Sequence, residues 1–267
     1  MFPMKRLLSM GAFALAVAGC MTGGKPGTAD WTGRTVAFLG DSITTPRQEN
    51  GIYWQFLEKS MGIKARVHAV SGYRWRHMPA MAEKLKAADG DNVDAILIFT
   101  GTNDYNGGVP LGDWWSITNE TANYNGTVRT APRRYPNFDS GTVRGRINAT
   151  MRYLKTNWPD AQIVLMTPIH RAYARFGEKN VQPPESFPNV NGIYFESYIQ
   201  TIREAADIWS VPLIDLYRES GLLPTEAAYA KCFRFKGGND LLHPNTEGHR
   251  RLAELIRLKL SALPPYR

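Results

Sequence analysis

The chain has 267 residues, of which 43% are hydrophobic, and a formal net charge of +8. No repeat, coiled-coil heptad or low-complexity tract interrupts it, so the length predicts one domain with a single sizeable core and excludes fibrous and repeat architectures. The positive charge would suit acidic partners, such as uronic-acid polysaccharides or anionic lipid surfaces, although scattered Lys and Arg are more often ordinary solvated surface.

Residues 1–19 are typical of the signal peptide of a bacterial lipoprotein. Lys5 and Arg6 give a positive start, and the apolar run 7–18 is shorter than the roughly 20 residues that span a membrane. The run leads into Gly19-Cys20, which resembles a lipobox. A lipidated Cys20 would anchor the protein in the bacterial cell envelope, in the periplasm or at the outer membrane. The alternative is an ordinary secretory signal with a coincidental cysteine.

Residues 20–30 contain several glycines and are expected to form a flexible tether, which leaves residues 31–267 as the folded domain. Cys232 is the one cysteine in that domain. A single thiol cannot form an internal disulfide, so the stability of the domain must come from its core.

Short apolar runs alternate with longer amphipathic stretches along the domain. Buried strands are predicted at Thr35–Leu39, Ala65–Val70, Ala95–Phe99, Ile163–Met166 and Val211–Ile214. Helices are predicted at Ile52–Met61, Met78–Ala87, Arg144–Thr156, Tyr194–Trp209 and Glu247–Leu260. This alternation predicts an α/β fold in which a parallel sheet has helices on both faces.

Two long connections, Tyr105–Ser140 and His170–Val190, interrupt this alternation. Loops of this length in a compact domain are usually functional or contain small elements of their own. Both follow predicted strands at their carboxyl ends, which is the edge where open α/β sheets bind ligands.

The first predicted strand ends in Gly40-Asp41-Ser42. A serine in this place, followed by a helix, can expose its hydroxyl on a tight turn, while the amino terminus of the helix points N–H groups at developing negative charge. The alternative is that Asp-Ser is an ordinary turn and helix cap.

The next two strands end in residues that can donate hydrogen bonds. Gly72 follows the second strand, where the lack of a side chain lets a backbone N–H approach a ligand, and Asn103 offers a side-chain amide after the third. Taken singly, each is equally an ordinary turn former.

Near the end of the chain, Asp240 precedes His243 with the spacing of one helical turn, which would place the two side chains on the same side. A carboxylate bonded to one imidazole nitrogen fixes the tautomer and leaves the other nitrogen to accept a proton from a serine. Asp215, after the fifth strand, is an alternative carboxylate at the same edge and could also partner His243.

These positions together resemble the SGNH hydrolase family, also called the GDSL family, over residues 34–258. The matching blocks are Gly40-Asp41-Ser42, Gly72, Gly101-x-Asn103-Asp104 and Asp240-x-x-His243. The resemblance implies a flavodoxin-like, three-layer α/β/α fold around a central parallel five-stranded sheet.

The resemblance also implies a serine esterase that forms an acyl-enzyme. Ser42 would be the nucleophile, His243 the base and Asp240 the residue that orients the base. The N–H groups of Ser42 and Gly72 and the side chain of Asn103 would form the oxyanion hole.

Other classes of site find less support in the sequence. The serine is not in a Gly-x-Ser-x-Gly elbow, and no Gly-x-Gly-x-x-Gly or Walker loop occurs. The remaining histidines form no cluster with the spacing of zinc ligands. We therefore expect no cofactor, no metal ion and no nucleic-acid partner.

Six aromatic residues fall in or near the segments that follow the strands: Trp75, Tyr105, Trp114, Trp115, Tyr124 and Tyr135. Aromatic faces stack on sugar rings, so the expected reaction is removal of acetyl or other short acyl groups from carbohydrate. The alternatives are a lipase or lysophospholipase beside the membrane and a non-catalytic carbohydrate-binding protein. The two long connections match nothing that would define the substrate further.

Overall fold

The computed structural model describes residues 29–46, 51–234 and 239–266. The predicted signal peptide, the predicted lipidation site Cys20 and most of the predicted tether lie outside these residues. Across the described ranges, no helix is both long enough and apolar enough to cross a membrane.

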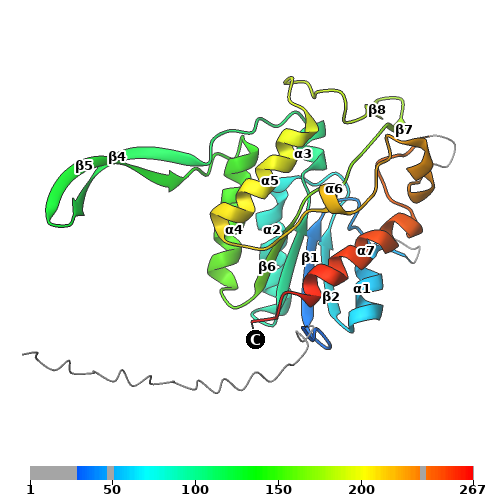
Figure 1. The fold of residues 1–267 in the computed structure, drawn as a ribbon, viewed down its shortest axis with the longest axis horizontal. Coiled ribbons are helices and arrows are strands. Elements are labelled where there is room, and N and C mark those ends of the chain that lie inside the picture. The colour runs from blue at the N-terminus through cyan, green and yellow to red at the C-terminus, as the bar shows by residue number, and fades with distance from the viewer. Residues whose placement is uncertain (1–28, 47–50, 235–238, 267) are drawn as a thin grey trace, which may run out of the picture.

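A parallel five-stranded sheet forms the centre of the molecule (Figure 1), as predicted. Its strands, in the spatial order β2-β1-β3-β6-β9, are β2 (Lys64–Ala69), β1 (Thr35–Gly40), β3 (Ala95–Phe99), β6 (Gln162–Met166) and β9 (Leu213–Ile214). The chain runs outward from β1 to β2 and then crosses back to β3 on the other side of β1. The order therefore reverses at β1, and such a switch point leaves a crevice at the carboxyl ends of the strands.

Helices cover both faces of the sheet, which gives the three-layer α/β/α arrangement (Figure 1). One face packs against α2 (Met78–Asp89), α4 (Val143–Asn157) and α5 (Phe195–Trp209), and the other against α1 (Tyr53–Met61) and α7 (Thr246–Ser261). Side chains alternate between the two faces along each strand, so Leu97 and Ile98 of β3 belong to different core clusters.

Within the described residues, four shorter helices were not predicted. They are the 3-10 helix η1 (Trp75–His77), α3 (Thr102–Asn106), α6 (Leu216–Glu219) and the 3-10 helix η2 (Ala227–Cys232). All are only one or two turns long, and a segment this short shows too few residues for a helical period to appear in the sequence.

Each long connection contains an antiparallel hairpin. The first forms β4 (Trp115–Tyr124) and β5 (Thr127–Pro136), a two-stranded arm that projects from the body of the protein (Figure 1). Its turn is Asn125-Gly126, where both residues have positive φ angles, 52° and 89°. The second forms the small pair β7 (Ala174–Gly177) and β8 (Asn180–Gln182).

Candidate active site

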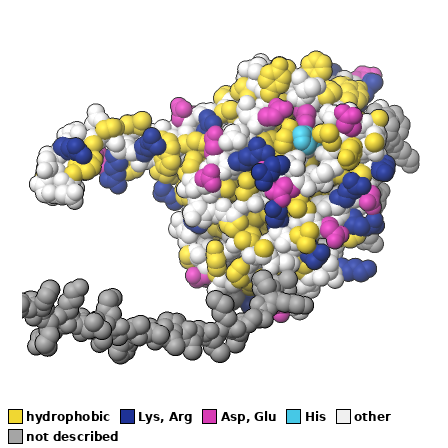
Figure 2. All heavy atoms as spheres, in the orientation of Figure 1, with side chains coloured by type: hydrophobic (Ala, Val, Ile, Leu, Met, Phe, Trp, Pro, Cys, Tyr) yellow, Lys and Arg dark blue, Asp and Glu magenta, His cyan; other side chains and the backbone are white. Residues whose placement is uncertain are grey.

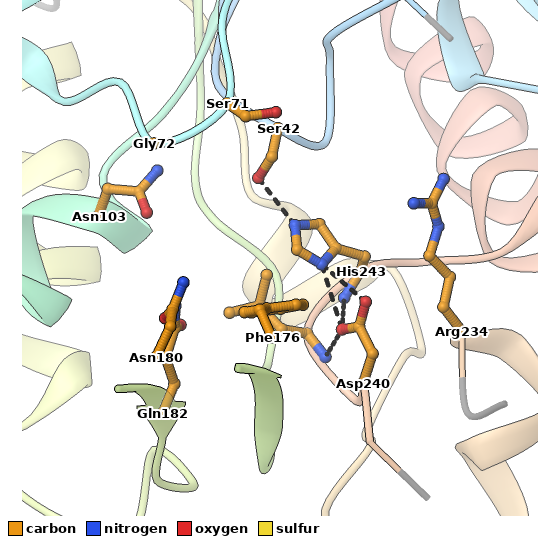
Figure 3. Close-up of a pocket in the computed structure, with 11 residues that line it drawn as sticks. Ser42, Ser71, Gly72, Asn103, Phe176, Asn180, Gln182, Arg234, Asp240 and His243 are labelled. Atoms are coloured by element: carbon orange, nitrogen blue, oxygen red, sulfur yellow. Dashed lines mark hydrogen bonds and ion pairs between the residues drawn. The ribbon is translucent and has the colours of Figure 1, made fainter. Parts of the chain in front are cut away.

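Three side chains from opposite ends of the chain meet at the carboxyl edge of the sheet (Figure 3). The Ser42 hydroxyl lies 2.8 Å from Nε2 of His243, and Nδ1 of His243 lies 2.9 Å from Oδ2 of Asp240. The imidazole and carboxylate are shielded, with 12% and 14% of their side-chain surfaces exposed. The structure thus brings together the serine, histidine and aspartate that the sequence pattern singled out.

Ser42 lies in a tight turn directly after β1. The N–H groups of Thr44 and Thr45 both donate to the carbonyl of Asp41, which folds the chain back over the end of the strand. A Cβ atom at Gly40 would lie 2.9 Å from the carbonyl oxygen of Phe99, so the turn needs glycine there. The expected helix amino terminus at Ser42 is not present, because α1 begins only at Tyr53.

Asp41 is buried beneath this turn. One of its carboxyl oxygens accepts a hydrogen bond from the N–H of Ile43 at 3.1 Å, which helps to fix the residue after the serine. Burial, with a smaller contribution from Asp104, raises the pKa of Asp41 to about 7, even though the Ile43 hydrogen bond favours the ionised form. The carboxyl group beside Ser42 therefore titrates near neutral pH.

The Asp240–His243 pair sits in a bend before α7, not in the helical turn that its spacing suggested. The Oδ1 atom of Asp240 accepts the backbone N–H groups of Leu242 and His243 at 3.1 and 2.9 Å. This side-chain-to-backbone turn brings the carboxylate up against the imidazole of the same short segment. The pairing is local, so it needs no contribution from a distant element.

Gly72 and Asn103 line the same cavity as Ser42 and His243. Gly72 has φ +81°, a conformation that favours glycine, and its N–H makes no hydrogen bond within the described part of the chain. The Asn103 amide donates to the carbonyl of Tyr73 at 3.0 Å and has a longer contact, 3.4 Å, with Asp41. Both predicted donors are therefore at the edge where the serine lies.

The cavity has a volume of about 480 Å³, and its wall presents polar and apolar surface in similar amounts. Six of the described lining residues, drawn in Figure 3, were not predicted as site residues: Phe176, Asn180, Gln182, Arg234, Ser71 and Leu242. The first three come from the β7–β8 hairpin, in the connection that follows β6. The ring of Phe176 meets the His243 imidazole edge-on, with centroids 5.2 Å apart, and so limits the access of water to the His243–Asp240 pair.

A buried arginine fixes the orientation of Gln182. The carbonyl oxygen of the Gln182 side chain accepts hydrogen bonds from Asn106 at 2.7 Å and from Arg171 at 3.2 Å. Desolvation lowers the pKa of Arg171 to about 10, but the group remains a cation at neutral pH. Because its acceptor is occupied, Gln182 presents its NH₂ group, which donates to Asn180 at 3.3 Å.

Asp215, the alternative partner for His243, is engaged elsewhere. Its carboxylate binds Arg203 at 2.9 Å and the Thr167 hydroxyl at 3.1 Å. Partial burial is the largest single influence on the pKa of Asp215 and acts to raise it. The charge and hydrogen bond of Arg203, together with the hydrogen bonds from the Arg218 N–H and Thr167, outweigh burial and hold this pKa below its usual value. Asp215 thus stabilises the turn after β9.

The six aromatic residues that suggested sugar stacking do not line the cavity. Trp75 and Tyr105 are fully buried, and Trp114 packs against the same core cluster. Tyr124 and Tyr135 lie on the arm, where arginine side chains cover their rings. Among the described residues that line the cavity, Phe176 is the aromatic one. No sequence pattern pointed to it, because the structure of its long connection could not be predicted.

The described residues contain no group of three or more His, Cys, Asp or Glu side chains that could hold a metal ion. His249 is buried and stacks on Tyr53. Burial lowers the pKa of His249 to about 3, so this histidine is neutral and belongs to the core.

A parallel sheet with a Ser–His–Asp chain at its carboxyl edge defines the class of this protein as an α/β/α hydrolase-type fold. Residues 38–251 match the model of the GDSL-like lipase/acylhydrolase family. The chain belongs to this family, and the predicted SGNH/GDSL resemblance is confirmed.

Several solved structures have a fold similar to that of this chain. A protein from Lactobacillus plantarum is 25% identical, with a TM-score of 0.66 over 87% of this chain and 98% of its own. A possible lipase from Chitinophaga pinensis is 17% identical, with a TM-score of 0.62 over 84% and 96% of the two chains. A catalytic mutant of an acetylxylan esterase from Geobacillus stearothermophilus is 17% identical, with a TM-score of 0.50 over 86% and 94%. No curated protein matches the chain significantly by sequence.

Proposed function

We propose that this protein is a serine esterase that hydrolyses carboxylic esters through an acyl-enzyme. The observation that carries the proposal is the continuous hydrogen-bonded chain from the Ser42 hydroxyl through His243 to Asp240. Membership of an acylhydrolase family supports the same class of reaction.

In the first half of the reaction, the Ser42 oxygen attacks the ester carbonyl while Nε2 of His243 takes the hydroxyl proton. Asp240 holds Nδ1 and stabilises the imidazolium that forms. The tetrahedral intermediate then collapses, its bond to the leaving oxygen breaks, and His243 gives the proton to the departing alcohol. A water molecule repeats the sequence on the acyl-enzyme and releases the acid.

Negative charge on the tetrahedral intermediate would be stabilised by the N–H groups of Ser42 and Gly72 and by the Asn103 amide. Gly72 supports this role because its N–H has no protein acceptor in the described residues. The long Asn103–Asp41 contact, at 3.4 Å, is the weaker of the two Asn103 interactions and is the one that an oxyanion would replace.

The proposed substrates are carbohydrates that carry acetyl or other short acyl groups. The cavity suits a polar alcohol and a short acyl chain, because Phe176 and Leu242 are the two hydrophobic residues among the described residues that line it. A longer acyl chain would need a continuous apolar groove. One neighbour in fold is an acetylxylan esterase, and acetylated polysaccharide is one class that fits this cavity.

Covalent labelling tests the proposal directly. A fluorophosphonate probe should modify wild-type protein at Ser42, and Ser42→Ala should neither react nor hydrolyse p-nitrophenyl acetate. An intact, folded protein that never reacts would favour the non-catalytic binding alternative.

Acyl-chain preference distinguishes this proposal from a lipase. We expect kcat/KM to be higher for p-nitrophenyl acetate than for the octanoate or dodecanoate ester. Phe176 and Leu242 offer a short apolar surface, so CH₂ groups beyond it would not gain the usual burial of about 0.8 kcal/mol each. A preference for the longer esters would favour a lipase or lysophospholipase.

We further propose that the enzyme works in the bacterial cell envelope, anchored through lipid on Cys20. The lipobox-like residues before this cysteine support that location. Mass spectrometry of the mature amino terminus would test it, because lipidation and cleavage before Cys20 give a diacylglyceryl-modified cysteine as the first residue. An unmodified terminus would contradict the anchor without affecting the proposed reaction.

A further inference from the structure

Among the described residues that line the cavity, one cation has no partner in the described part of the chain. Arg234 is half-buried in the cavity wall, beside His243 and Asp240. Within residues 29–46, 51–234 and 239–266, its guanidinium makes no hydrogen bond or ion pair. The nearby Asp240 carboxylate is already committed to His243 Nδ1 and to two backbone N–H groups.

The backbone of Arg234 is fixed to the segment that holds the imidazole. Its N–H donates to the carbonyl of His243 at 2.9 Å, and its neighbour Phe233 forms a β-bridge with Pro244. In Figure 3 the guanidinium and the Asn103 amide lie on opposite sides of the His243 ring. The cation is therefore built into the site at a defined position, on the side away from the proposed oxyanion donors.

A half-buried guanidinium without a counter-ion is unfavourable in the free protein. Desolvation lowers the pKa of Arg234, and the field of Asp240 only partly compensates. A ligand anion would supply the missing partner in a place shielded from bulk water, where charge-assisted hydrogen bonds are strongest.

We propose that Arg234 forms an anion subsite that binds a carboxylate on the alcohol part of the substrate, so that the preferred substrates are acyl esters of acidic sugars such as uronates. This inference rests on the proposed esterase function. His243 protonates the leaving alcohol, so the alcohol must depart on the imidazole side of the carbonyl, which is the side where Arg234 lies.

The chemistry of the cavity favours a carboxylate over a phosphate. The planar guanidinium matches both oxygens of a carboxylate, and among the described residues that line the cavity there is no second Lys or Arg to balance a dianion. The adjacent Asp240 carboxylate would also repel a doubly charged group more strongly. Asn180 and Gln182 add amide donors that can hold the hydroxyl groups of the sugar.

The test compares two substrates that differ by one charge, an acetylated methyl glucuronoside and its uncharged methyl ester. Wild-type enzyme should prefer the acid, and Arg234→Gln should lower the ratio of the two kcat/KM values by about 10- to 100-fold, the usual range for losing a hydrogen bond to a charged group. Arg234→Lys should restore part of the ratio. Arg175→Gln removes one exposed positive charge that does not line the cavity and should leave the ratio unchanged.

A ratio that is unaffected by Arg234→Gln would overturn the inference, and so would an equal loss in Arg175→Gln, which would indicate a general field effect. A binding measurement distinguishes a failure of the anion-subsite inference from a failure of the proposed esterase function. Calorimetry of methyl glucuronoside with Ser42→Ala, with and without Arg234→Gln, should show binding that depends on Arg234. If Ser42 never reacts and this binding persists, the esterase proposal is wrong and the anion subsite remains.

Discussion

Asp41 places a carboxyl group with a raised pKa directly beneath the reactive serine. Because its pKa in the folded state, about 7, lies above the usual aspartate value of 3.8, its contribution to stability is complete below pH 3.8 and is lost as the pH rises to about 7. At about 1.4 kcal/mol per pKa unit, the effect is on the order of 4 kcal/mol. Above neutral pH the fold therefore contains a buried carboxylate that opposes folding.

Asp41→Asn should remove this dependence. The free energy of unfolding of the variant, minus that of the wild type, should rise between pH 4 and pH 7, as measured by urea unfolding at several pH values. Comparing the two proteins at each pH cancels the other titrating groups, and any loss of the Ile43 hydrogen bond adds only a constant offset. A difference that stays flat would mean that Asp41 is already ionised at pH 4 in the folded protein.

The Asn103 amide could act on the oxyanion directly, or it could act only by holding the Tyr73 carbonyl in place. Asn103→Ala should lower kcat by about 10²- to 10³-fold with little change in KM, because the amide would act mainly in the transition state. The matched control is Thr100→Val, which removes the other side-chain donor to the Tyr73 carbonyl, at 3.5 Å. If the two variants lose activity equally, placement of the Tyr73 carbonyl explains the loss and the oxyanion role is wrong.

At the level of elements, the two hairpins differ in what they contact. The β7–β8 hairpin contributes side chains to the cavity, whereas the arm formed by β4 and β5 projects away from the body (Figure 2). Ile117 and Val128 of the arm are 65% and 64% exposed, and Figure 2 shows Arg side chains along it. The arm therefore contributes little to the core.

Excision of the arm should leave the body intact. Trp115 and Pro136 are cross-strand neighbours, so an Asn-Gly turn can replace residues 116–135. Stability should change by no more than about 0.5 kcal/mol, and kcat/KM for p-nitrophenyl acetate should stay within about twofold, a barrier change below about 0.5 kcal/mol. The measurements are urea unfolding and initial rates.

A matched excision in the second hairpin provides the contrast. Arg175 and Val181 are also cross-strand partners, and an Asn-Gly turn in place of residues 176–180 removes Phe176 and Asn180. This variant should lose about tenfold or more in kcat/KM, because the wall that orients the substrate is gone. Equal behaviour of the two excised proteins would contradict the assignment of the cavity wall to β7–β8.

The sequence predicted the sheet and its main helices because their signals are local. Runs such as Ala95–Phe99 are buried on both faces, and the motif residues directly follow such strands. The arm also had a local signal, since Asn125-Gly126 between β-prone residues is a strong indicator of a hairpin. The position of Arg234 had no local signal in the sequence, because it depends on the β-bridge between Phe233 and Pro244, which forms only in the folded chain.

At the scale of the whole molecule, one thin sheet joins two core clusters. Leu97 and Ile98 are adjacent on β3 and fully buried, yet Leu97 packs toward α1 and α7 and Ile98 toward α2, α4 and α5. Since both clusters need β3 in place, neither layer of helices should remain folded without the other. The domain should therefore unfold in one cooperative step.

Leu97→Ala and Ile98→Ala test this on the two faces separately. Each should lower the free energy of unfolding by about 2–5 kcal/mol, the usual result of a large-to-small change in a packed core. Circular dichroism and tryptophan fluorescence should report the same single midpoint, because Trp31 lies in one cluster and Trp75 and Trp158 lie in the other. Ile117→Ala on the arm is the control and should change stability by less than about 0.5 kcal/mol. Two separate transitions in either core variant would mean that the helical layers fold independently of the strand they share.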